Sequence, residues 1–214
     1  MPSLLLDSIL IKGNVLLEQP SSPVSPGVLL DTSPEFAAEC AILCRTLEAF
    51  RSSYGFGRAI AMPQIGILRR VIAINLGSCR EADRYSSTLP GVSCSTFIMV
   101  NPVITYRSDS FRTLWDDCFS LPNMMVRVQR HTEVSVEWQD ASTGELYVWD
   151  RKDMHFDLSE LLQHEIDHLD GILATERQCP LTSPSVEGPI PTVIRRDDYE
   201  ARKDHYSKMV DYVI

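Results

Sequence analysis

The sequence has no apolar run long enough to cross a membrane and no cluster of basic residues. A membrane-spanning helix needs about 20 apolar residues in succession, and residues 1–7 lack the basic start of a secretory signal. The chain has 29 acidic and 20 basic side chains, for a net charge of −9. Because DNA and anionic membranes repel such a surface, we expect an intracellular protein that binds neither DNA nor membranes.

The sequence also lacks any Cys-x-x-Cys pair among its six cysteines. For a chain of this length, six cysteines without such a pair indicate a protein whose thiols are reduced and not joined in a disulfide framework. Cys40 and Cys44 are one helical turn apart, and we expect both to pack in the core, because free cysteine is among the most buried residue types. The chain shows no internal repeat, and 214 residues with a hydrophobic fraction of 44% suit one compact domain over residues 1–214.

The first part of the chain predicts one long helix and one buried strand. A hydroxyl cap and an early proline at 32–35 begin a helix that should run to about residue 52. The side chains expected to be buried on that helix are Ala38, Ile42, Leu43, Leu47 and Phe50. The other predicted elements are an N-terminal strand or extended arm at 8–19, a loop at 20–27, irregular backbone at 54–66 and a β-branched strand at 70–76.

The later part of the chain predicts strands in hairpin-like succession. Residues 133–140 alternate between apolar and polar side chains and connect through a turn to 146–149, which indicates a hairpin. We further predict a surface-loop insertion at 77–95, a strand at 96–104 interrupted or edged at Pro102, an unpatterned stretch at 115–122, a strand at 126–130, and a tail region at 180–214 with a terminal helix at about 197–213. This order favours an α+β fold with antiparallel sheets packed around a central helix.

That central helix is expected at 157–170 and contains a His-Glu-x-x-His motif. Asp157 is the expected N-cap, Glu160 stands at the capping-box position, and Gly171 is the expected stop. One face gathers Leu158, Leu161, Leu162 and Leu169, and the opposite face, expected to meet water, gathers Glu160, Gln163, Asp167 and Asp170. Glu165 falls within the apolar face, where a carboxylate is costly unless its charge or proton is used.

Two histidines at i and i+4 on one helix face can bind one metal ion, with the intervening glutamate turned toward the metal's water. Such a site needs a third protein ligand. A metzincin would have histidine at position 174, where this chain has Ala174, and Glu187 lies in a Pro-rich stretch that cannot form the later helix of a thermolysin-like site. A metallopeptidase therefore lacks its ligand, and the non-functional alternative is two surface histidines beside a stray glutamate. The other histidines, His131, His155 and His205, are expected to be ordinary.

Three segments of the chain resemble the signatures of the peptide deformylase family. Residues 163–171, Gln-His-Glu-Ile-Asp-His-Leu-Asp-Gly, resemble its third signature. Residues 57–66 are similar to Gly-x-Gly-x-Ala-Ala-Pro-Gln-x-Gly, and residues 116–120 are similar to Glu-Gly-Cys-Leu-Ser. The three segments occur in the family's order, and the resemblance covers roughly residues 8–178.

The resemblance implies that Cys118, His164 and His168 hold one divalent metal ion. Ferrous iron is the metal implied in the cell, with zinc, nickel or cobalt able to replace it. A thiolate and two imidazoles leave a fourth position open, as a catalytic site requires.

The resemblance also implies the roles of the groups around the metal. Glu165 would take a proton from water and later deliver one to the departing amine. Gln64 and the backbone N–H of Phe119 would donate to the oxyanion. The implied partners are N-formyl-methionyl peptides or nascent chains, with transient ribosome association.

The chain departs from the family's signatures at several positions without losing a catalytic group. Ala59 replaces a glycine in the first signature, and Met62 replaces an alanine. Asp117, which replaces a glycine, adds negative charge to a substrate rim shared with Gly57 and Ala59, and Phe119 replaces a leucine and can crowd the cleft. Asp116 stands in place of glutamate and is expected to pair with Arg130.

The sequence therefore predicts a metal-dependent hydrolase that removes the formyl group from N-formyl-methionyl peptides and releases formate. The alternatives are a deformylase-like protein with weak or altered substrate specificity and a metallopeptidase. A bacterial source would place the protein in the cytoplasm, and a eukaryotic source would place it in a mitochondrion or plastid.

Overall fold

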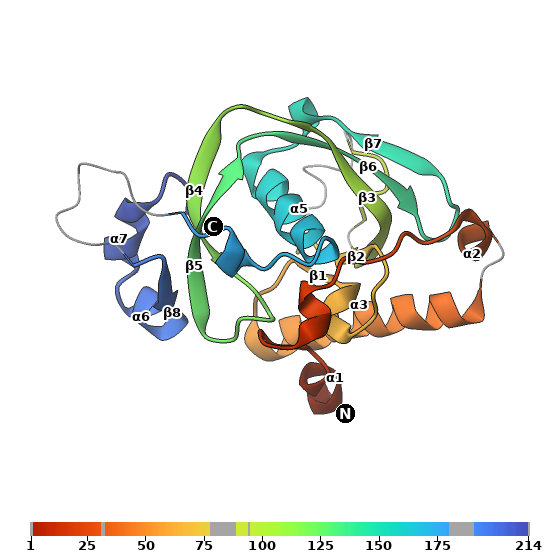
Figure 1. Cartoon of the computed structure of the whole chain (residues 1–214), viewed down its shortest axis with the longest axis horizontal. Coiled ribbons are helices and arrows are strands. Elements are labelled where there is room, and N and C mark those ends of the chain that lie inside the picture. Colours follow the sequence, from red (N-terminus) through yellow and green to blue (C-terminus); the bar gives the residue numbers. More distant parts are fainter. Residues whose placement is uncertain (1, 31–32, 78–88, 94, 180–190, 214) are drawn as a thin grey trace.

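Two antiparallel sheets flank one central helix in the computed structural model, which describes residues 2–30, 33–77, 89–93, 95–179 and 191–213 (Figure 1). The five-stranded sheet has the order β1 (Ala59–Ala61), β2 (Val71–Ile74), β3 (Phe97–Arg107), β6 (Val134–Asp140) and β7 (Leu146–Trp149). The three-stranded sheet has the order β4 (Phe111–Asp117), β5 (Met124–His131) and β8 (Val193–Arg195). All strand pairs are antiparallel, which confirms the predicted α+β class.

The N-terminal region is helical and turn-rich, so the predicted strand or extended arm at 8–19 is wrong. The chain forms α1 (Pro2–Asp7), η1 (Val15–Glu18) and α2 (Pro26–Leu30). The Asn14 side chain caps η1 by accepting a hydrogen bond from the Leu16 amide at 3.0 Å. Leu17 is buried against the body of the protein. A local cap and one anchoring side chain therefore replace the sheet pairing that the apolar run suggested.

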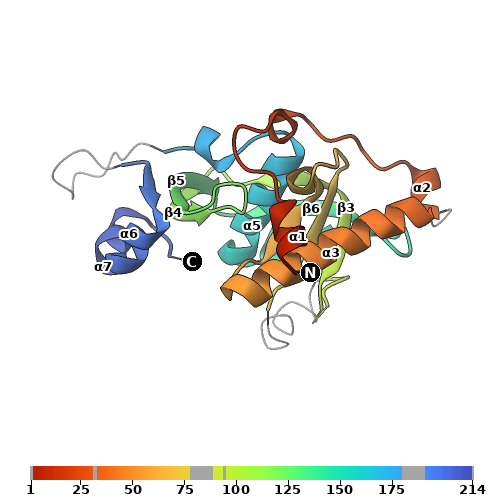
Figure 2. The ribbon, with the colours of Figure 1, turned by 90° about the horizontal axis from the view of Figure 1, so that it is seen from below.

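The long helix α3 (Pro34–Tyr54) confirms the predicted helix. Ser33 caps its start, and Gly55, with a φ of 78°, ends it. Leu43 and Leu47 are buried as predicted, whereas Ala38 and Ile42 are exposed. The error is one of phase, because Phe36, Leu43 and Leu47 share one face of the helix, whereas Ala38 and Ile42 lie on the opposite side. The helix packs below the five-stranded sheet with α1 beside it (Figure 2).

Cys40 and Cys44 are half-buried on this same helix and pack against the core, in line with the prediction. Burial raises the pKa of the Cys40 thiol to about 12 and that of Cys44 to about 11. Both thiols are therefore protonated and unreactive near neutral pH.

Two stretches that were predicted to be irregular or unpatterned contain strands. Residues 54–66 include β1 and the 3₁₀ turn η2 (Met62–Ile65), and residues 115–117 belong to β4. The strand β3 is irregular at Pro102 as predicted, since its register shifts between Val100 and Val103, and Asn101 has a φ of 50°. The β6–β7 hairpin also agrees with the prediction. Two further 3₁₀ turns are η3 (Arg151–Asp153) and η4 (Ala174–Glu176).

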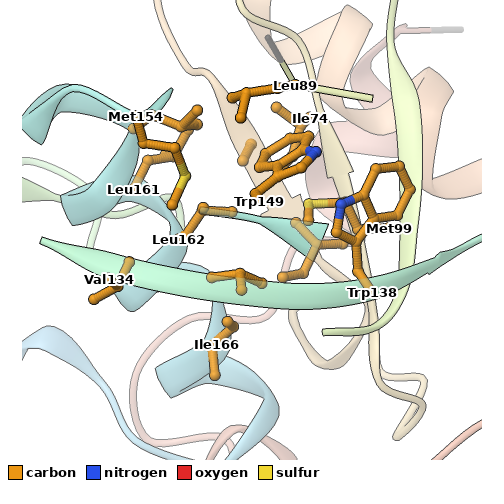
Figure 3. Packing of buried hydrophobic residues seen from close by; sticks show 14 of the residues in the cluster. Ile74, Leu89, Met99, Val134, Trp138, Trp149, Met154, Leu161, Leu162 and Ile166 are labelled. Carbon is orange, nitrogen blue, oxygen red and sulfur yellow. The ribbon is translucent and has the colours of Figure 1, made fainter. Parts of the chain in front are cut away.

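The main core lies between the five-stranded sheet and α5 (Phe156–Leu169) (Figure 3). In this core Trp138 and Trp149 pack edge to face with a centroid distance of 5.4 Å, in one cluster with Leu161 and Leu162 of the helix. Leu89 is buried in this core, and the carbonyl of Pro90 accepts a hydrogen bond from the Trp149 indole at 2.8 Å. The predicted surface insertion at 77–95 is therefore wrong at Leu89. Residues 78–88 and 94 of that prediction lie outside the described residues.

The central helix α5 is buried on every side except at Asp157. Its N-cap is His155, two residues before the predicted cap, whereas Gly171, with a φ of 75°, ends it as predicted. The face predicted to meet water is buried at Glu160, Gln163 and Asp167. Sheets cover both faces of this helix, and partners inside the protein take the place of water.

The C-terminal segment is broken into short elements in place of the predicted helix at 197–213. After β8 come α6 (Arg196–Ala201), α7 (Lys203–Tyr206) and η5 (Ser207–Met209). The helical path breaks at Arg202, which has a φ of −130°. Residues 180–190 of the predicted tail lie outside the described residues. Among the helices that the structure describes, none is long and apolar enough to cross a bilayer.

Candidate metal centre

Three potential metal ligands converge from α5 and from the end of β4. The ligand atoms of Cys118, His164 and His168 all lie within 4.8 Å of one another, and all three residues are buried. The Cys118 Sγ lies 3.1 Å from His168 Nε2. Helical spacing places the histidines on one face of α5, but only the tertiary fold brings a cysteine 46 residues before His164 to that face. This is the one such group of ligands among the residues that the structure describes.

Asp116 orients His164 by accepting a hydrogen bond from its Nδ1 at 2.8 Å. This bond leaves Nε2 as the atom of His164 that is free to bind a metal. Arg130 donates to Asp116 at 3.0 Å, as predicted, and also pairs with Asp167 on α5. Arg177 binds the other oxygen of Asp167 at 2.8 Å. A chain of alternating charges, buried from Asp116 to Asp167 and exposed at Arg177, therefore holds His164 in place.

The charges of this network shift the pKa values of the two histidines in opposite directions. Burial alone would raise the pKa of Asp116, but His164 and Arg130 outweigh it and hold that pKa well below its ordinary value. Burial opposes the protonation of His164, yet Asp116 raises its pKa. Burial and the charge of His164 lower the pKa of His168. His168 is therefore neutral, which is the form that binds metals.

Glu165 is buried on α5 beside the three ligands. Its Oε2 has no hydrogen-bond partner among the described residues. Burial raises the pKa of Glu165 to about 7, with Asp116 and Glu160 adding to the rise and His164 and Arg58 opposing it. A carboxylate with a pKa near neutrality can both accept and release a proton at physiological pH.

Gln64 reaches the centre from η2 in a fixed orientation. Its Oε1 accepts a hydrogen bond from the Ala61 amide at 2.9 Å, which turns its Nε2 toward the ligands. That Nε2 lies 3.2 Å from Ser120 Oγ and 3.7 Å from Cys118 Sγ. The amide nitrogen of Gln64 therefore faces the metal-ligand group, with Ser120 Oγ and Cys118 Sγ as its hydrogen-bond acceptors.

Phe119 and Gly57 fit against each other at the rim. The Phe119 ring stacks on Phe50 of α3 with a centroid distance of 3.7 Å. A Cβ on Gly57 would lie 2.5 Å from the Phe119 ring, and Gly57 has a φ of 106°. The rim therefore requires glycine at position 57 in the presence of phenylalanine at position 119.

A cleft of about 370 Å³ opens onto these residues. Every predicted catalytic and rim residue lines this cleft. Of the predicted metal ligands, Cys118 and His164 line it and His168 does not. The lining residues include Gln64, Cys118, His164 and Glu165 from the centre, and Gly57, Ala59, Asp117 and Phe119 from the rim.

The cleft also contains groups that the sequence did not reveal. Arg58 pairs with the buried Glu160 and donates a hydrogen bond to the carbonyl of Asp157 at 2.8 Å. The C-terminal segment contributes Arg196 and Tyr199 to the lining. For the Arg58–Glu160 pair, the sequence offered one signal, an acidic residue close to the metal motif. It gave no indication of the partner, which is 102 residues away.

Comparison with known proteins agrees with this geometry. The polypeptide deformylase family matches residues 6–183. A peptide deformylase from Leptospira biflexa is 32% identical over 169 residues, covering 79% of this chain and 86% of that relative. A probable peptide deformylase from Synechococcus phage S-SSM7 superposes with a TM-score of 0.59 at 27% identity, over 79% of this chain and 97% of that chain. The Met-Ala-Ser-bound class I type b peptide deformylase from Acinetobacter baumannii superposes with a TM-score of 0.58 at 26% identity, over 79% of this chain and 96% of that chain. The chain therefore belongs to the peptide deformylase family.

Proposed function

We propose that this enzyme removes the N-formyl group of nascent peptides at the centre formed by Cys118, His164 and His168, with Glu165 as its proton carrier. The family assignment supports the reaction itself, in which an N-formyl peptide is hydrolysed to formate and a free amino terminus. The observation that carries the assignment of residues is the convergence of one thiol and two imidazoles beside a buried carboxylate, one oxygen of which has no hydrogen-bond partner among the described residues.

The three side chains fit a divalent metal ion. One imidazole is oriented through its far nitrogen by a carboxylate, and the other is held neutral by burial. A thiolate with two imidazoles suits iron, zinc, nickel and cobalt alike. We propose ferrous iron as the metal in the cell, on the resemblance of the three signatures to those of the family.

In this mechanism the protein positions the substrate and moves its protons. The metal ion, when bound, supplies a Lewis acid that lowers the pKa of water and polarises the formyl carbonyl. Glu165 accepts the proton of the attacking water and delivers a proton to the departing amine. The Nε2 of Gln64 and the backbone N–H of Phe119 donate hydrogen bonds to the oxygen that gains negative charge. The cleft would hold the peptide behind the formyl group.

The proposed substrates are N-formyl-methionyl peptides, and transient association with the ribosome would deliver nascent chains to the cleft. A solved relative holds Met-Ala-Ser, a peptide that such a reaction would release. We also propose that residues 1–214 act as one catalytic domain, because the C-terminal segment packs directly on β5 and on β4, the strand that leads into Cys118.

Substitution of Glu165 by alanine tests the proposed mechanism. The metal content of the purified protein should stay unchanged, because Glu165 is not a ligand. Formate release from formyl-Met-Ala-Ser by protein loaded with ferrous iron without oxygen should fall by about 10²-fold or more. Glu35→Ala, at an exposed position in the first turn of α3, is the matched control and should keep full activity. Retained activity in Glu165→Ala would remove the proposed role of this residue.

A further inference from the structure

The C-terminal segment forms part of the cleft, although it lies beyond residue 183, where the match to the family ends. β8 pairs with β5 through Met125–Ile194 and Val126–Val193, and α6 follows without a loop. α6 and β8 lie beside β5 on the side away from the five-stranded sheet (Figure 1). The first turn of α6 thereby reaches the mouth of the cleft.

Alternation along β4 explains why this segment faces the cleft. Successive side chains of a strand point to opposite faces. Asp116 faces α5, whereas Thr113, Trp115 and Asp117 share the face that meets the C-terminal segment. The Thr113 amide donates to Asp211 Oδ2 at 2.9 Å, and the Trp115 indole N–H donates to a carbonyl of α7 at 2.9 Å. These contacts fix the segment along the whole strand, up to the residue beside Cys118.

Arg196 contacts both sides of the cleft. Its guanidinium forms an ion pair with Asp117 at the end of the three-stranded sheet. The same guanidinium lies over the ring of Phe56, 4.3 Å from its centroid, in the connection that leads into the five-stranded sheet. Phe56 in turn packs edge-on against Phe50 at 5.3 Å, and Phe50 stacks on Phe119. One side chain therefore links Asp117 to the aromatic rim on the other side.

We propose that Arg196 is a substrate-positioning residue that joins the two sides of the cleft, so that the C-terminal segment is part of the peptide-binding site. This inference rests on the proposed function and adds to it. Asp117 departs from the glycine of the family signature, and the partner that neutralises its charge lies outside the matched region. Arg196 touches neither the metal ligands nor Glu165 in any described contact. It should therefore act on how firmly the peptide is held and leave the chemical step unchanged.

Kinetics with formyl-Met-Ala-Ser test this inference. Arg196→Ala should raise KM roughly fivefold to tenfold and leave kcat within about twofold, because one partly exposed ion pair and one cation–π contact are lost. Adding Asp117→Gly to Arg196→Ala should bring KM part of the way back to the wild-type value, since it removes the carboxylate left without its partner. Arg196→Lys should have a KM between those of Arg196→Ala and the wild type, because lysine keeps the charge but not the planar group. The matched control is Arg195→Ala, which removes the adjacent, exposed arginine that pairs with Asp197.

Calorimetric binding of the product peptide Met-Ala-Ser separates this inference from the proposed function. Formate release by the wild-type enzyme decides the proposed function alone. The ratio of Kd between Arg196→Ala and the wild type decides the inference, and an increase of roughly fivefold is expected. Equal Kd and KM in the two proteins would overturn it. An equal effect of Arg195→Ala, a fall confined to kcat, or no binding of the peptide to the wild type would also overturn it.

Discussion

Replacement of Asp116 by asparagine should weaken metal binding without unfolding the protein. Asp116 accepts hydrogen bonds from two donors, His164 Nδ1 at 2.8 Å and Arg130 at 3.0 Å. Both donors bind the same oxygen, Oδ2. Asparagine has the same shape and can place its amide oxygen there, but it lacks the negative charge that holds both donors. Loss of the group that orients a ligating histidine costs about 10- to 100-fold in metal affinity, which corresponds to roughly 1.4–2.8 kcal/mol. Arg130 would keep its ion pair with Asp167, which limits the loss of stability.

Competition of the metal-free protein with a chromophoric chelator for zinc measures this effect. The matched control is Asp117→Asn, the same change one residue further along β4 but on the opposite face. Its affinity for zinc should stay within about twofold of the wild type, because Asp117 contacts no ligand in the described structure. Thermal unfolding of the metal-free variants checks that both are folded. Equal zinc affinities in the two variants would refute the role assigned to Asp116.

Two further predictions concern stability. Arg58→Met should lower the free energy of unfolding in urea by about 2 kcal/mol, because it leaves Glu160 buried without its partner, and Arg58→Met with Glu160→Leu should recover most of the loss. Partial exposure of Arg58 keeps this figure below that of a fully buried pair. Asp211→Asn should destabilise the protein at pH 7, because two hydrogen bonds from Thr113 lower the pKa of Asp211. A carboxylate whose pKa is lowered by folding stabilises the folded protein at pH values above its pKa in the unfolded chain, about 3.9. The difference in unfolding free energy between Asp211→Asn and the wild type should therefore narrow as the pH falls below about 4. A difference in unfolding free energy that stays constant from pH 7 to pH 3 would contradict this.

Local signals in the sequence predicted elements whose boundaries depend on neighbouring residues. The cap at Ser33 and the stop at Gly55 lie within α3's own sequence, and the turn at 142–145 similarly defines the β6–β7 hairpin. The C-terminal segment was not predicted in this way, because no glycine or proline marks its break at Arg202, and its two short helices place Tyr199 and Tyr206 against Trp115 of β4. β4 was missed because Asp116 and Asp117 obscure the alternation of a strand whose two faces are both covered.

The central helix shows why burial was harder to predict than helix formation. Periodicity correctly separated an apolar face from a polar one, but it assigned the polar face to water. In the structure Gln163 bonds the backbone of His131 on β5, and Asp167 pairs with Arg130 of the same strand. A polar face solvated by water and one satisfied by a neighbouring sheet have the same local sequence. Only the position of that sheet distinguishes them.

The sequence by itself was enough to predict the candidate reactive groups of this protein. Two histidines share one face of the predicted helix with a glutamate between them, and three signatures in order predict Cys118 and Gln64 as their partners. Tertiary structure alone decided what surrounds them: the carboxylate that orients His164, the arginine that neutralises Glu160, and the C-terminal arginine that meets Asp117. The physical reason is range. Chemistry at a motif depends on spacings of a few residues, whereas pairing of buried charges depends on residues 48 to 102 positions apart that meet only when the two sheets enclose the helix.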